Sequence, residues 1–279
     1  MTDAATPAAT VPATPVPRAA DPGRWTVVTG ASSGIGAALA RAFAVQGDGL
    51  VLVARRRDRL DVLAAELAVT HGTPVRIYAF DLEDPDAPLA LMRAIEDDGV
   101  AIHTLINNAG FGLRGRFASL PAARQLAMVQ LNVAALTSLC RHVMPGLIAR
   151  KAGGILNVAS LAAFQAGPNM AVYYASKAYV LSLSEALHEE AKPHGVTVTA
   201  LCPGPVETEF AAVADLEGSS LFRTNVMTAA EVAKSGLAGY RAGRAIVVPG
   251  AMTAFAPLAA RLLPRALMRR LAGRLQAVE

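Results

Sequence analysis

The sequence predicts an α/β protein in which a parallel β-sheet is covered by helices on both faces. Two observations predict this class: seven short apolar stretches recur along the chain, and stretches with the apolar spacing of helices lie between them. Strands that are buried on both faces of a parallel sheet are continuously apolar, whereas half-exposed strands alternate. The 279 residues suffice for one large α/β domain or two small ones.

Seven strands and the helices between them follow one another along the chain. One helical stretch, for example, places apolar residues at Leu60, Leu63, Ala64 and Leu67. The expected strands, in chain order, are Trp25–Thr29, Leu50–Ala54, Val75–Phe80, Ile102–Ile106, Ile155–Ala159, Val196–Leu201 and Ala245–Val248.

Three segments of different composition are expected. Residues 1–23 contain five prolines and few charges, so we expect a disordered lead. They lack the basic start and apolar run of a secretory signal, and one arginine is too few for an organelle-targeting peptide. Residues 24–250 are expected to form a single domain, and residues 251–279 a basic amphipathic helical tail.

Composition restricts the compartment and the partners. Apolar residues make up 53% of the chain, yet no uninterrupted apolar run approaches the length of about 18 residues that a membrane-spanning helix needs. Two cysteines, Cys140 and Cys202, fit a reducing cytoplasm. The tail holds five arginines and one acid, which is the whole formal excess of +4, so the folded body offers no basic face for nucleic acid. The histidines show no metal-ligand spacing, and no metal is expected.

A glycine-rich turn joins the first strand to a helix that is expected to begin near Ala37. The turn reads Thr29-Gly30-Ala31-Ser32-Ser33-Gly34-Ile35-Gly36. Glycines at a strand-to-helix turn let backbone N–H groups approach a pyrophosphate, which the helix N-terminus also attracts. An ordinary glycine-rich turn is the alternative, but the strand before it and the helix after it favour a dinucleotide.

The end of the second strand indicates which dinucleotide. An acid about 20 residues beyond the turn binds the ribose diol of NAD. Here that place is filled by Ala54 and Arg55, and Arg56 and Arg57 follow before the first acid at Asp58. Arginine pairs well with phosphate, so the sequence predicts NADP(H). Three incidental arginines at a solvated helix N-terminus are the alternative.

Four motifs together resemble the short-chain dehydrogenase/reductase family over about residues 24–250. They are the glycine turn, Asn107-Asn108-Ala109-Gly110, Tyr173-Tyr174-Ala175-Ser176-Lys177 and Pro203-Gly204, in the family's order and spacing. The resemblance implies a Rossmann-type doubly wound sheet of about seven parallel strands and an NAD(P)(H) oxidoreductase activity on a small-molecule carbonyl or alcohol.

The resemblance also implies roles for individual residues. Asn132, Ser160, Tyr173 and Lys177 match the catalytic set. Asp81 would meet the adenine, and Asn108 to Gly110 would border the adenosine ribose. With Ser33 at the place where NADP-binding members often carry a basic residue, the 2′-phosphate would depend mainly on Arg55 and less on Arg56. The full set of implied cofactor contacts is Gly30, Ser32, Ser33, Gly34, Ile35, Gly36, Arg55, Asp81, Leu82, Asn108, Ala109, Gly110, Tyr173, Lys177, Pro203, Gly204, Val206 and Thr208.

The chemistry of Tyr173 and Lys177 also follows from their spacing. They are four residues apart in a helical stretch, Val172–Ala191, so the ammonium is expected near the phenol and to lower its pKa. The phenol would then exchange a proton with a carbonyl or alcohol oxygen, which Ser160 would stabilise. Asn132 would hold a water that feeds protons to Lys177. Each has a structural alternative: Tyr174 competes with Tyr173 but is i,i+3 from Lys177, Ser160 could be a strand-end cap, and Asn132 a buried helix asparagine.

The substrate side is less determined. A loop runs from Thr208 to about Asn225 and contains Phe210, Leu216, Leu221 and Phe222. In the family this segment closes over the substrate, so its apolar content favours a hydrophobic substrate, with packing of a lid against the domain as the alternative. A same-fold epimerase or dehydratase, and a non-catalytic dinucleotide-binding protein, are the rival functions.

Two surfaces are expected to meet partners. In the family, the helices that correspond to Leu120–Ile148 and Val172–Ala191 commonly form a homodimer or homotetramer. In the tail, Leu267, Met268, Leu271 and Leu275 share one side of a helix, and Arg265, Arg269, Arg270 and Arg274 the other. Such a helix can lie peripherally on an anionic membrane or dock on the domain or a partner subunit. Docking would use the same apolar side, so we expect one or the other.

Overall fold

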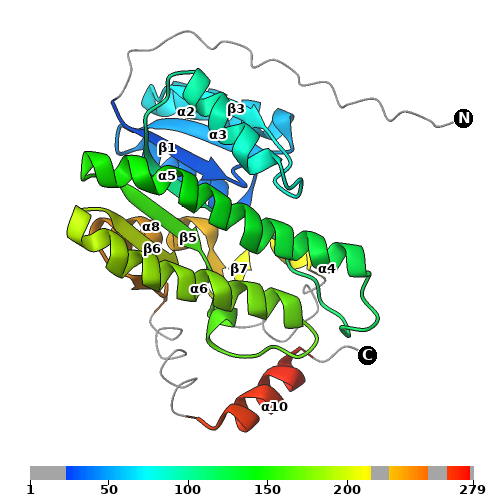
Figure 1. The fold of residues 1–279 in the computed structure, drawn as a ribbon. Coiled ribbons are helices and arrows are strands. Elements are labelled where there is room, and N and C mark those ends of the chain that lie inside the picture. Colours follow the sequence, from blue (N-terminus) through cyan, green and yellow to red (C-terminus); the bar gives the residue numbers. More distant parts are fainter. Residues whose placement is uncertain (1–22, 215–225, 251–262, 277–279) are drawn as a thin grey trace, which may run out of the picture.

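A seven-stranded parallel sheet forms the centre of the computed structural model, which describes residues 23–214, 226–250 and 263–276 (Figure 1). The strand order is β3-β2-β1-β4-β5-β6-β9, and every neighbouring pair is parallel. The strands are β1 (Trp25–Thr29), β2 (Gly49–Ala54), β3 (Val75–Ala79), β4 (Ile102–Asn107), β5 (Gly154–Val158), β6 (Thr197–Leu201) and β9 (Ile246–Val247). All seven predicted strands are confirmed, each to within one residue at either end.

Helices cover both faces of the sheet, as predicted. One hydrophobic cluster joins the sheet to α3 (Ala87–Asp97), α5 (Leu136–Arg150) and α6 (Ala171–Ala191), and the second joins it to α1 (Gly34–Ala44), α2 (Arg57–His71) and α8 (Ala229–Arg241). Figure 1 shows α5 and α6 side by side across the front of the sheet. The chain leaves β1 toward β2 and β3 and then returns to β4, so the strand order reverses between β1 and β4. Ligands of open α/β sheets bind at such a reversal, beyond the carboxyl ends of the strands.

Three local features differ from the expectation or add to it. Helix α1 begins at Gly34 rather than near Ala37, because the last glycines of the turn already belong to its first turn. The predicted helix Leu120–Ile148 is α4 (Ala122–Val129), a π-helical stretch (Gln130–Ala135) and α5 in succession. A second, two-stranded sheet pairs β7 (Val206–Glu207) with β8 (Met227–Thr228).

Short helices complete the described structure. They are the 3-10 turns Leu161–Phe164 and Lys192–His194, helix α7 (Phe210–Val213) and helix α10 (Arg265–Leu275). The expected disordered lead and three of the four expected lid residues (Leu216, Leu221 and Phe222) lie outside the described residues, and so do residues 251–262 of the tail. The proposed domain boundaries at 23 and 250 border these segments. Among the described residues, no helix is both long and apolar enough to cross a membrane.

Helix α10 docks on the body of the protein through a face that the sequence did not indicate. Ala272 and Gln276 are each 2% exposed, whereas Leu267 and Leu271 are 43% and 41% exposed. The Gln276 carbonyl accepts a hydrogen bond from Asn169 Nδ2 (3.0 Å). Our expectation that docking would bury the apolar side of the helix is therefore wrong for Leu267 and Leu271, which stay exposed, whereas Met268 of the same side borders the cavity described below.

Candidate active site

The glycine turn leads from β1 into α1 in a shape that only glycine permits at two points. Gly30 has a φ of +64°, in the left-handed region. A Cβ at Gly36 would lie 2.2 Å from the Gly30 carbonyl oxygen and 2.5 Å from Asn108 Nδ2. The turn therefore keeps its backbone exposed beside the N-terminus of α1, where N–H groups and the helix dipole favour an anion.

Thr29 and Asn108 fasten this turn to β4 across the reversal of the strand order. The Thr29 hydroxyl accepts hydrogen bonds from the backbone N–H groups of Asn108 and Ala109, both at 3.0 Å. Asn108 Nδ2 donates to the carbonyls of Thr29 (3.0 Å) and Gly30 (3.1 Å). The side chain of Asn108 thus shapes the turn itself, which adds a positioning function to the ribose contact that the resemblance implies.

A cavity of about 650 Å³ extends from this turn to the start of α6. It brings together all but two of the residues that the sequence singled out; Gly36 and Asn132 are the two that do not line it. The predicted residues that line it are Gly30, Ser32, Ser33, Gly34, Ile35, Arg55, Asp81, Leu82, Asn108, Ala109, Gly110, Ser160, Tyr173, Lys177, Pro203, Gly204, Val206 and Thr208. The cavity lies where the fold predicts a ligand site.

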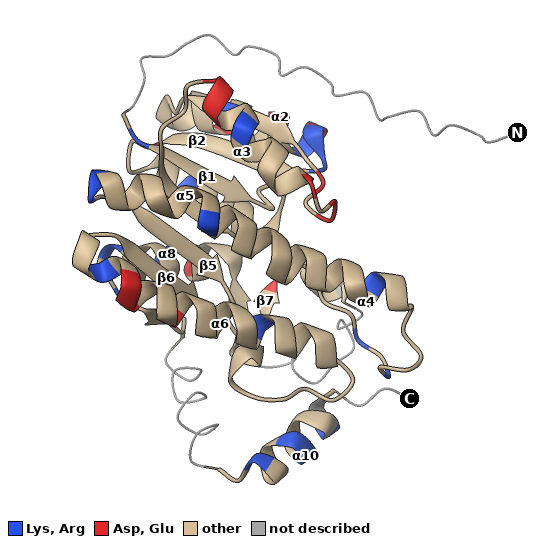
Figure 2. Cartoon of the chain, in the orientation of Figure 1, with Lys and Arg blue, Asp and Glu red and all other residues tan. Residues whose placement is uncertain are grey.

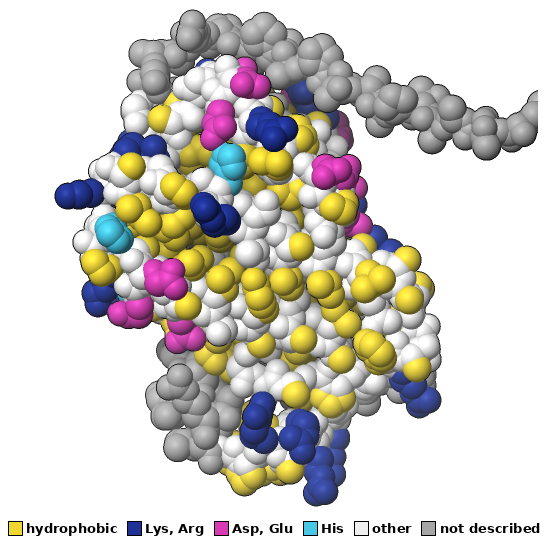
Figure 3. Space-filling view, viewed as in Figure 1, with side chains coloured by type: hydrophobic (Ala, Val, Ile, Leu, Met, Phe, Trp, Pro, Cys, Tyr) yellow, Lys and Arg dark blue, Asp and Glu magenta, His cyan; other side chains and the backbone are white. Residues whose placement is uncertain are grey.

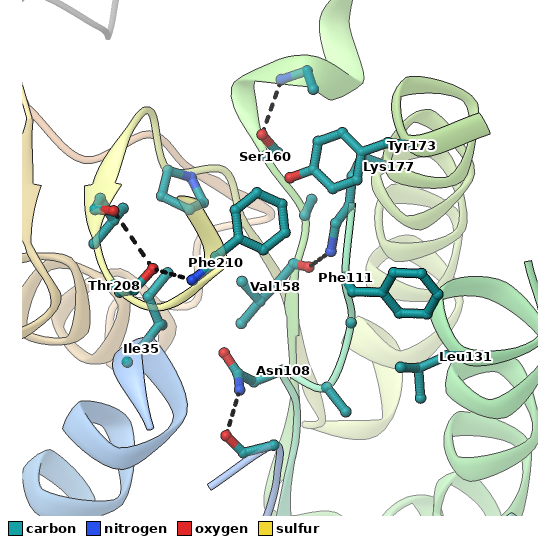
Figure 4. A pocket seen from close by; sticks show the side chains of 18 of the residues that line it. Ile35, Asn108, Phe111, Leu131, Val158, Ser160, Tyr173, Lys177, Thr208 and Phe210 are labelled. Carbon is teal, nitrogen blue, oxygen red and sulfur yellow. Dashed lines mark hydrogen bonds between the residues drawn. The ribbon is translucent and has the colours of Figure 1, made fainter. Parts of the chain in front are cut away.

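Tyr173, Ser160 and Lys177 meet at the far end of this cavity (Figure 4). Tyr173 lies in the first turn of α6 and Lys177 one turn later, so both side chains share a helix face. Ser160 follows β5, and its hydroxyl also accepts from the Ala162 N–H (3.1 Å). Lys177 Nζ donates to the Val158 carbonyl (2.8 Å) and lies 5.9 Å from the centroid of the Tyr173 ring.

Burial governs the proton affinities of this group. It raises the pKa of Tyr173 to about 12, against a hydrogen bond with Ser160 that lowers it. It lowers the pKa of Lys177 to about 8, with the nearby Cys202 acting in the opposite direction. Our expectation that the ammonium would lower the pKa of Tyr173 is not met in the protein alone, because desolvation dominates. The phenol is accordingly protonated at neutral pH and able to donate.

Asn132 lies in the π-helical stretch between α4 and α5 and is buried. Its Oδ1 accepts from the Phe111 N–H (3.2 Å), and its Nδ2 donates to the Phe111 carbonyl (3.0 Å) and to Ser176 Oγ (3.1 Å). Both hydrogens of the amide are therefore used within the protein. The side chain fixes the loop after β4 against α6, and a part in proton supply stays a prediction.

The two arginines after β2 take different directions. Arg55 Nη1 lies 2.9 Å from Glu83 Oε1 and 3.7 Å from Asp81 Oδ2, on the β3 side of the cavity. Arg56 instead reaches the glycine turn, where its Nη2 donates to Ser32 Oγ (3.1 Å) and Ser33 Oγ (2.9 Å). The Arg56 guanidinium thus lies beside Ser33, at the position where NADP-binding members of the family often carry a basic residue of their own.

The cavity also contains residues that sequence reasoning missed as site residues. Phe111, Met170, Met268 and Gln276 also line it, and Phe210 packs on the Tyr173 ring at a centroid distance of 5.4 Å. Gln276 Nε2 donates to the Tyr174 hydroxyl (3.2 Å). The motif set covers neither Met268 nor Gln276, because both belong to the tail. Met268 was noted only as part of the apolar side of an amphipathic helix, and no sequence signal indicated Gln276.

Comparison with known proteins identifies the class. The model of the short chain dehydrogenase family matches residues 24–217, so this chain belongs to the short-chain dehydrogenase family. Among solved structures, a short-chain dehydrogenase from Sphingobium yanoikuyae in complex with NADPH is 35% identical, with a TM-score of 0.78 over 88% of this chain and 95% of that one. The bulky-bulky ketone specific alcohol dehydrogenase from Comamonas testosteroni is 31% identical, with a TM-score of 0.72 over 88% and 93%.

Curated relatives differ in what they act on. A sulfoacetaldehyde reductase from Chromohalobacter salexigens is 37% identical over 74% of this chain and 84% of its own length. A very-long-chain 3-oxoacyl-CoA reductase from Anas platyrhynchos is 32% identical over 68% of this chain and 62% of its own. The matched region thus spans less than two thirds of the latter relative. These matches show the family, and the names of the two relatives give different substrates.

Proposed function

We propose that this protein is an NADP(H)-dependent oxidoreductase that interconverts a carbonyl and an alcohol, with Tyr173 as the acid/base. The observation that carries the proposal is that the hydroxyls of Tyr173 and Ser160 face one cavity, at the end of which a glycine turn suits a dinucleotide. Bound nicotinamide would supply or accept the hydride. A same-fold epimerase or dehydratase remains the rival enzyme.

The protein's own residues would handle the proton and the charge. In reduction, Tyr173 would donate its phenolic proton to the substrate oxygen, which its raised pKa permits at neutral pH. Ser160 would hydrogen-bond the same oxygen and stabilise its developing negative charge. Lys177, with its ammonium held against the Val158 carbonyl, would stabilise the phenolate left behind.

The phosphate of NADP(H) has suitable partners at the turn. Arg56 lies against Ser32 and Ser33, and Arg55 lies at the end of β2 where an NAD site would carry an acid. The NADPH complex of the Sphingobium yanoikuyae relative supports this choice, whereas a family member from Burkholderia phymatum binds NAD. We propose that Arg56 contributes more than Arg55, because Arg56 reaches the hydroxyls of the glycine turn, whereas Arg55 is directed toward Glu83 on the β3 side.

An apolar substrate fits the lining of the cavity. Its substrate half is formed by Leu161, Phe164, Met170, Phe210 and Met268, with the Gln276 amide as a polar group beside Tyr174. Arg124 also borders the cavity, but it pairs with Glu83 and lies over the Phe111 ring. A bulky ketone therefore fits better than a small sulfonate, which would need an unpaired cation.

The deciding experiment compares two neighbouring tyrosines. Tyr173→Phe and Tyr174→Phe remove the same hydroxyl at adjacent positions, and NADPH consumption is followed over ketones graded by size and polarity. We expect Tyr173→Phe to lose about 100-fold or more in turnover with little change in NADPH affinity, and Tyr174→Phe to keep most of its activity. A Tyr173→Phe protein that retains a tenth of the wild-type rate would exclude Tyr173 as the acid/base.

The same assay addresses the non-catalytic alternative. A human relative that is 33% identical over 68% of this chain bears the name inactive hydroxysteroid dehydrogenase-like protein 1. Binding of NADPH without turnover of any ketone would place this protein with a dinucleotide-sensing function instead. The presence of Ser160, Tyr173 and Lys177 around one cavity supports catalysis.

We also propose that the protein is cytoplasmic and forms a homodimer or homotetramer through α4, α5 and α6. Both cysteines are buried free thiols, which suits a reducing compartment. Figure 3 shows hydrophobic side chains gathered over α5 and α6 with few charges between them. Leu126, Val129 and Tyr179 are exposed on these helices, and an exposed apolar surface of this kind supports the proposed interface.

We also propose that α10 contacts a membrane surface peripherally, now on the ground that some of its leucines stay exposed while the helix is docked. Leu267 and Leu271 are exposed on the helix and Leu263 is exposed just before it, and the described part of the tail contains arginines, which Figure 2 shows in blue, and no acidic residue. Because docking uses Ala272 and Gln276, a lipid surface and the docked position are compatible. Leucines flanked by arginines suit an anionic membrane surface.

A further inference from the structure

Glu209 places a carboxylate at the position where a cofactor phosphate would bind. It follows Thr208, whose methyl group lies close to Gly34, and thus reaches the glycine turn from the opposite wall of the cavity. Glu209 Oε2 lies 2.8 Å from Arg56 Nη2, and Glu209 Oε1 lies 3.2 Å from Arg59 Nη1. The Arg56 guanidinium holds the pKa of Glu209 below its usual value, so the group is ionised at neutral pH.

The Arg56 nitrogen that faces the turn is fully engaged. Nη2 carries two hydrogens, and its two nearest oxygens are Glu209 Oε2 at 2.8 Å and Ser33 Oγ at 2.9 Å; Ser32 Oγ lies 3.1 Å from Nη2 and also accepts from Nε (3.3 Å). A phosphate oxygen can bond to this nitrogen only by replacing one of them. Carboxylate and phosphate compete most directly, because both are anions that bind guanidinium by charge-assisted hydrogen bonds.

We propose that Glu209 is an intramolecular competitor of the cofactor's 2′-phosphate, which must displace the carboxylate from Arg56. This inference rests on the proposed use of NADP(H). Glu209 then limits the affinity for NADPH while leaving that for NADH unchanged, since NADH has no phosphate at this place. The preference of the site for NADPH over NADH is thereby set by Glu209, which follows β7, together with the arginines that follow β2.

The test uses ligands that bind without chemistry. Adenosine 2′,5′-bisphosphate carries the phosphate in question and 5′-AMP lacks it, and calorimetry measures both affinities for the wild-type chain and for Glu209→Gln. Glu207→Gln is the matched control. This substitution removes the same charge two residues away, and Glu207 forms no ion pair among the described residues. Titration with NADPH and NADH repeats the comparison with whole cofactors.

We expect Glu209→Gln to bind the bisphosphate about two- to fivefold more tightly, which is the range of one exposed ion pair, and to bind 5′-AMP as the wild type does. In an Arg56→Ala background the same substitution is expected to have no effect, because the contested guanidinium is gone. Glu207→Gln is expected to change neither affinity.

Three results would overturn the proposal. Weaker binding of the bisphosphate by Glu209→Gln would mean that Glu209 orients Arg56 for phosphate. Equal tightening for both ligands would mean a general effect of charge. A wild-type chain that binds both ligands equally would overturn the proposed use of NADP(H) as well, which separates that failure from a failure of the competition alone.

Discussion

Replacement of Lys177 by methionine is expected to stabilise the protein at neutral pH although it removes a residue of the proposed catalytic group. Lys177 is 6% exposed, and burial lowers its pKa from the ordinary 10.5 to about 8. At 1.36 kcal/mol per pKa unit, burial of the ammonium costs about 3 kcal/mol at pH 7. Methionine avoids this cost, and it loses a hydrogen bond to Val158 that contributes about 1 kcal/mol.

The net gain is about 2 kcal/mol, or roughly 5 °C in Tm for a chain of this size. Its dependence on pH distinguishes the mechanism. Between pH 8 and 10.5 the unfolded chain keeps the Lys177 proton and the folded chain releases it, so the stability of the wild type rises with pH in this window. The advantage of the variant is therefore complete below pH 8 and disappears by about pH 10.5.

Thermal and urea unfolding of the wild type and of Lys177→Met from pH 6.5 to 10.5 measure the difference in their free energies of unfolding. Groups that titrate alike in both proteins contribute equally to the two values and cancel in the difference. Lys234→Met is the control, because Lys234 is exposed on α8 and the same chemical change there relieves no burial. A Lys177→Met protein that is less stable than the wild type at pH 7 would refute the reasoning. A stability gap that stays constant from pH 7 to 10.5 would refute it equally.

Three further outcomes are expected. Sedimentation at micromolar concentration should give a dimer or larger species, and Leu126→Glu with Tyr179→Glu should shift it to monomer; a wild-type monomer would remove the proposed interface. Anionic vesicles should retain the protein in a salt-sensitive manner that Leu267→Glu with Leu271→Glu abolishes without a change in Tm, about 1 kcal/mol coming from each basic residue near the surface; equal retention of both proteins would show that α10 does not contact lipid. Gln276→Leu should raise the KM for ketones that carry a distant hydroxyl by about fivefold, from the loss of about 1 kcal/mol in one hydrogen bond, and spare purely apolar ketones; an unchanged ratio between the two would place Gln276 in docking alone.

The sheet could be predicted because each strand is short, apolar and bounded by polar or turn residues. The pair β7 and β8 could not, since two residues such as Val206 and Glu207 are too few for any periodicity. The π-helical stretch around Asn132 was also hidden, because its apolar spacing continues that of α4 and α5.

Within the site, the motifs named residues that the structure brings together around one cavity, but the sequence did not indicate side-chain directions that only the fold decides. The sequence favoured Arg55 over Arg56 as the partner of the 2′-phosphate, but only Arg56 leaves β2 on the side of the glycine turn. The pKa of Tyr173 depends on how deeply it is buried, which the spacing to Lys177 does not reveal. Gln276 reaches the cavity through packing of α10 near Asn169, more than a hundred residues away in sequence.

The fastening of the glycine turn by Asn108 has a consequence for how such sequences can vary. Gly36 and Asn108 are more than seventy positions apart, yet a Cβ at Gly36 would lie 2.5 Å from the Asn108 amide. Substitutions at the two sites should therefore be epistatic: a change at either alters which residues the other tolerates. A mutational scan scored on cofactor affinity would recover Thr29 and Asn108 together with the glycines, even where they touch no cofactor atom. The constraint on substitution therefore extends over two segments that are distant in sequence, the glycine turn and the end of β4, rather than over the turn alone.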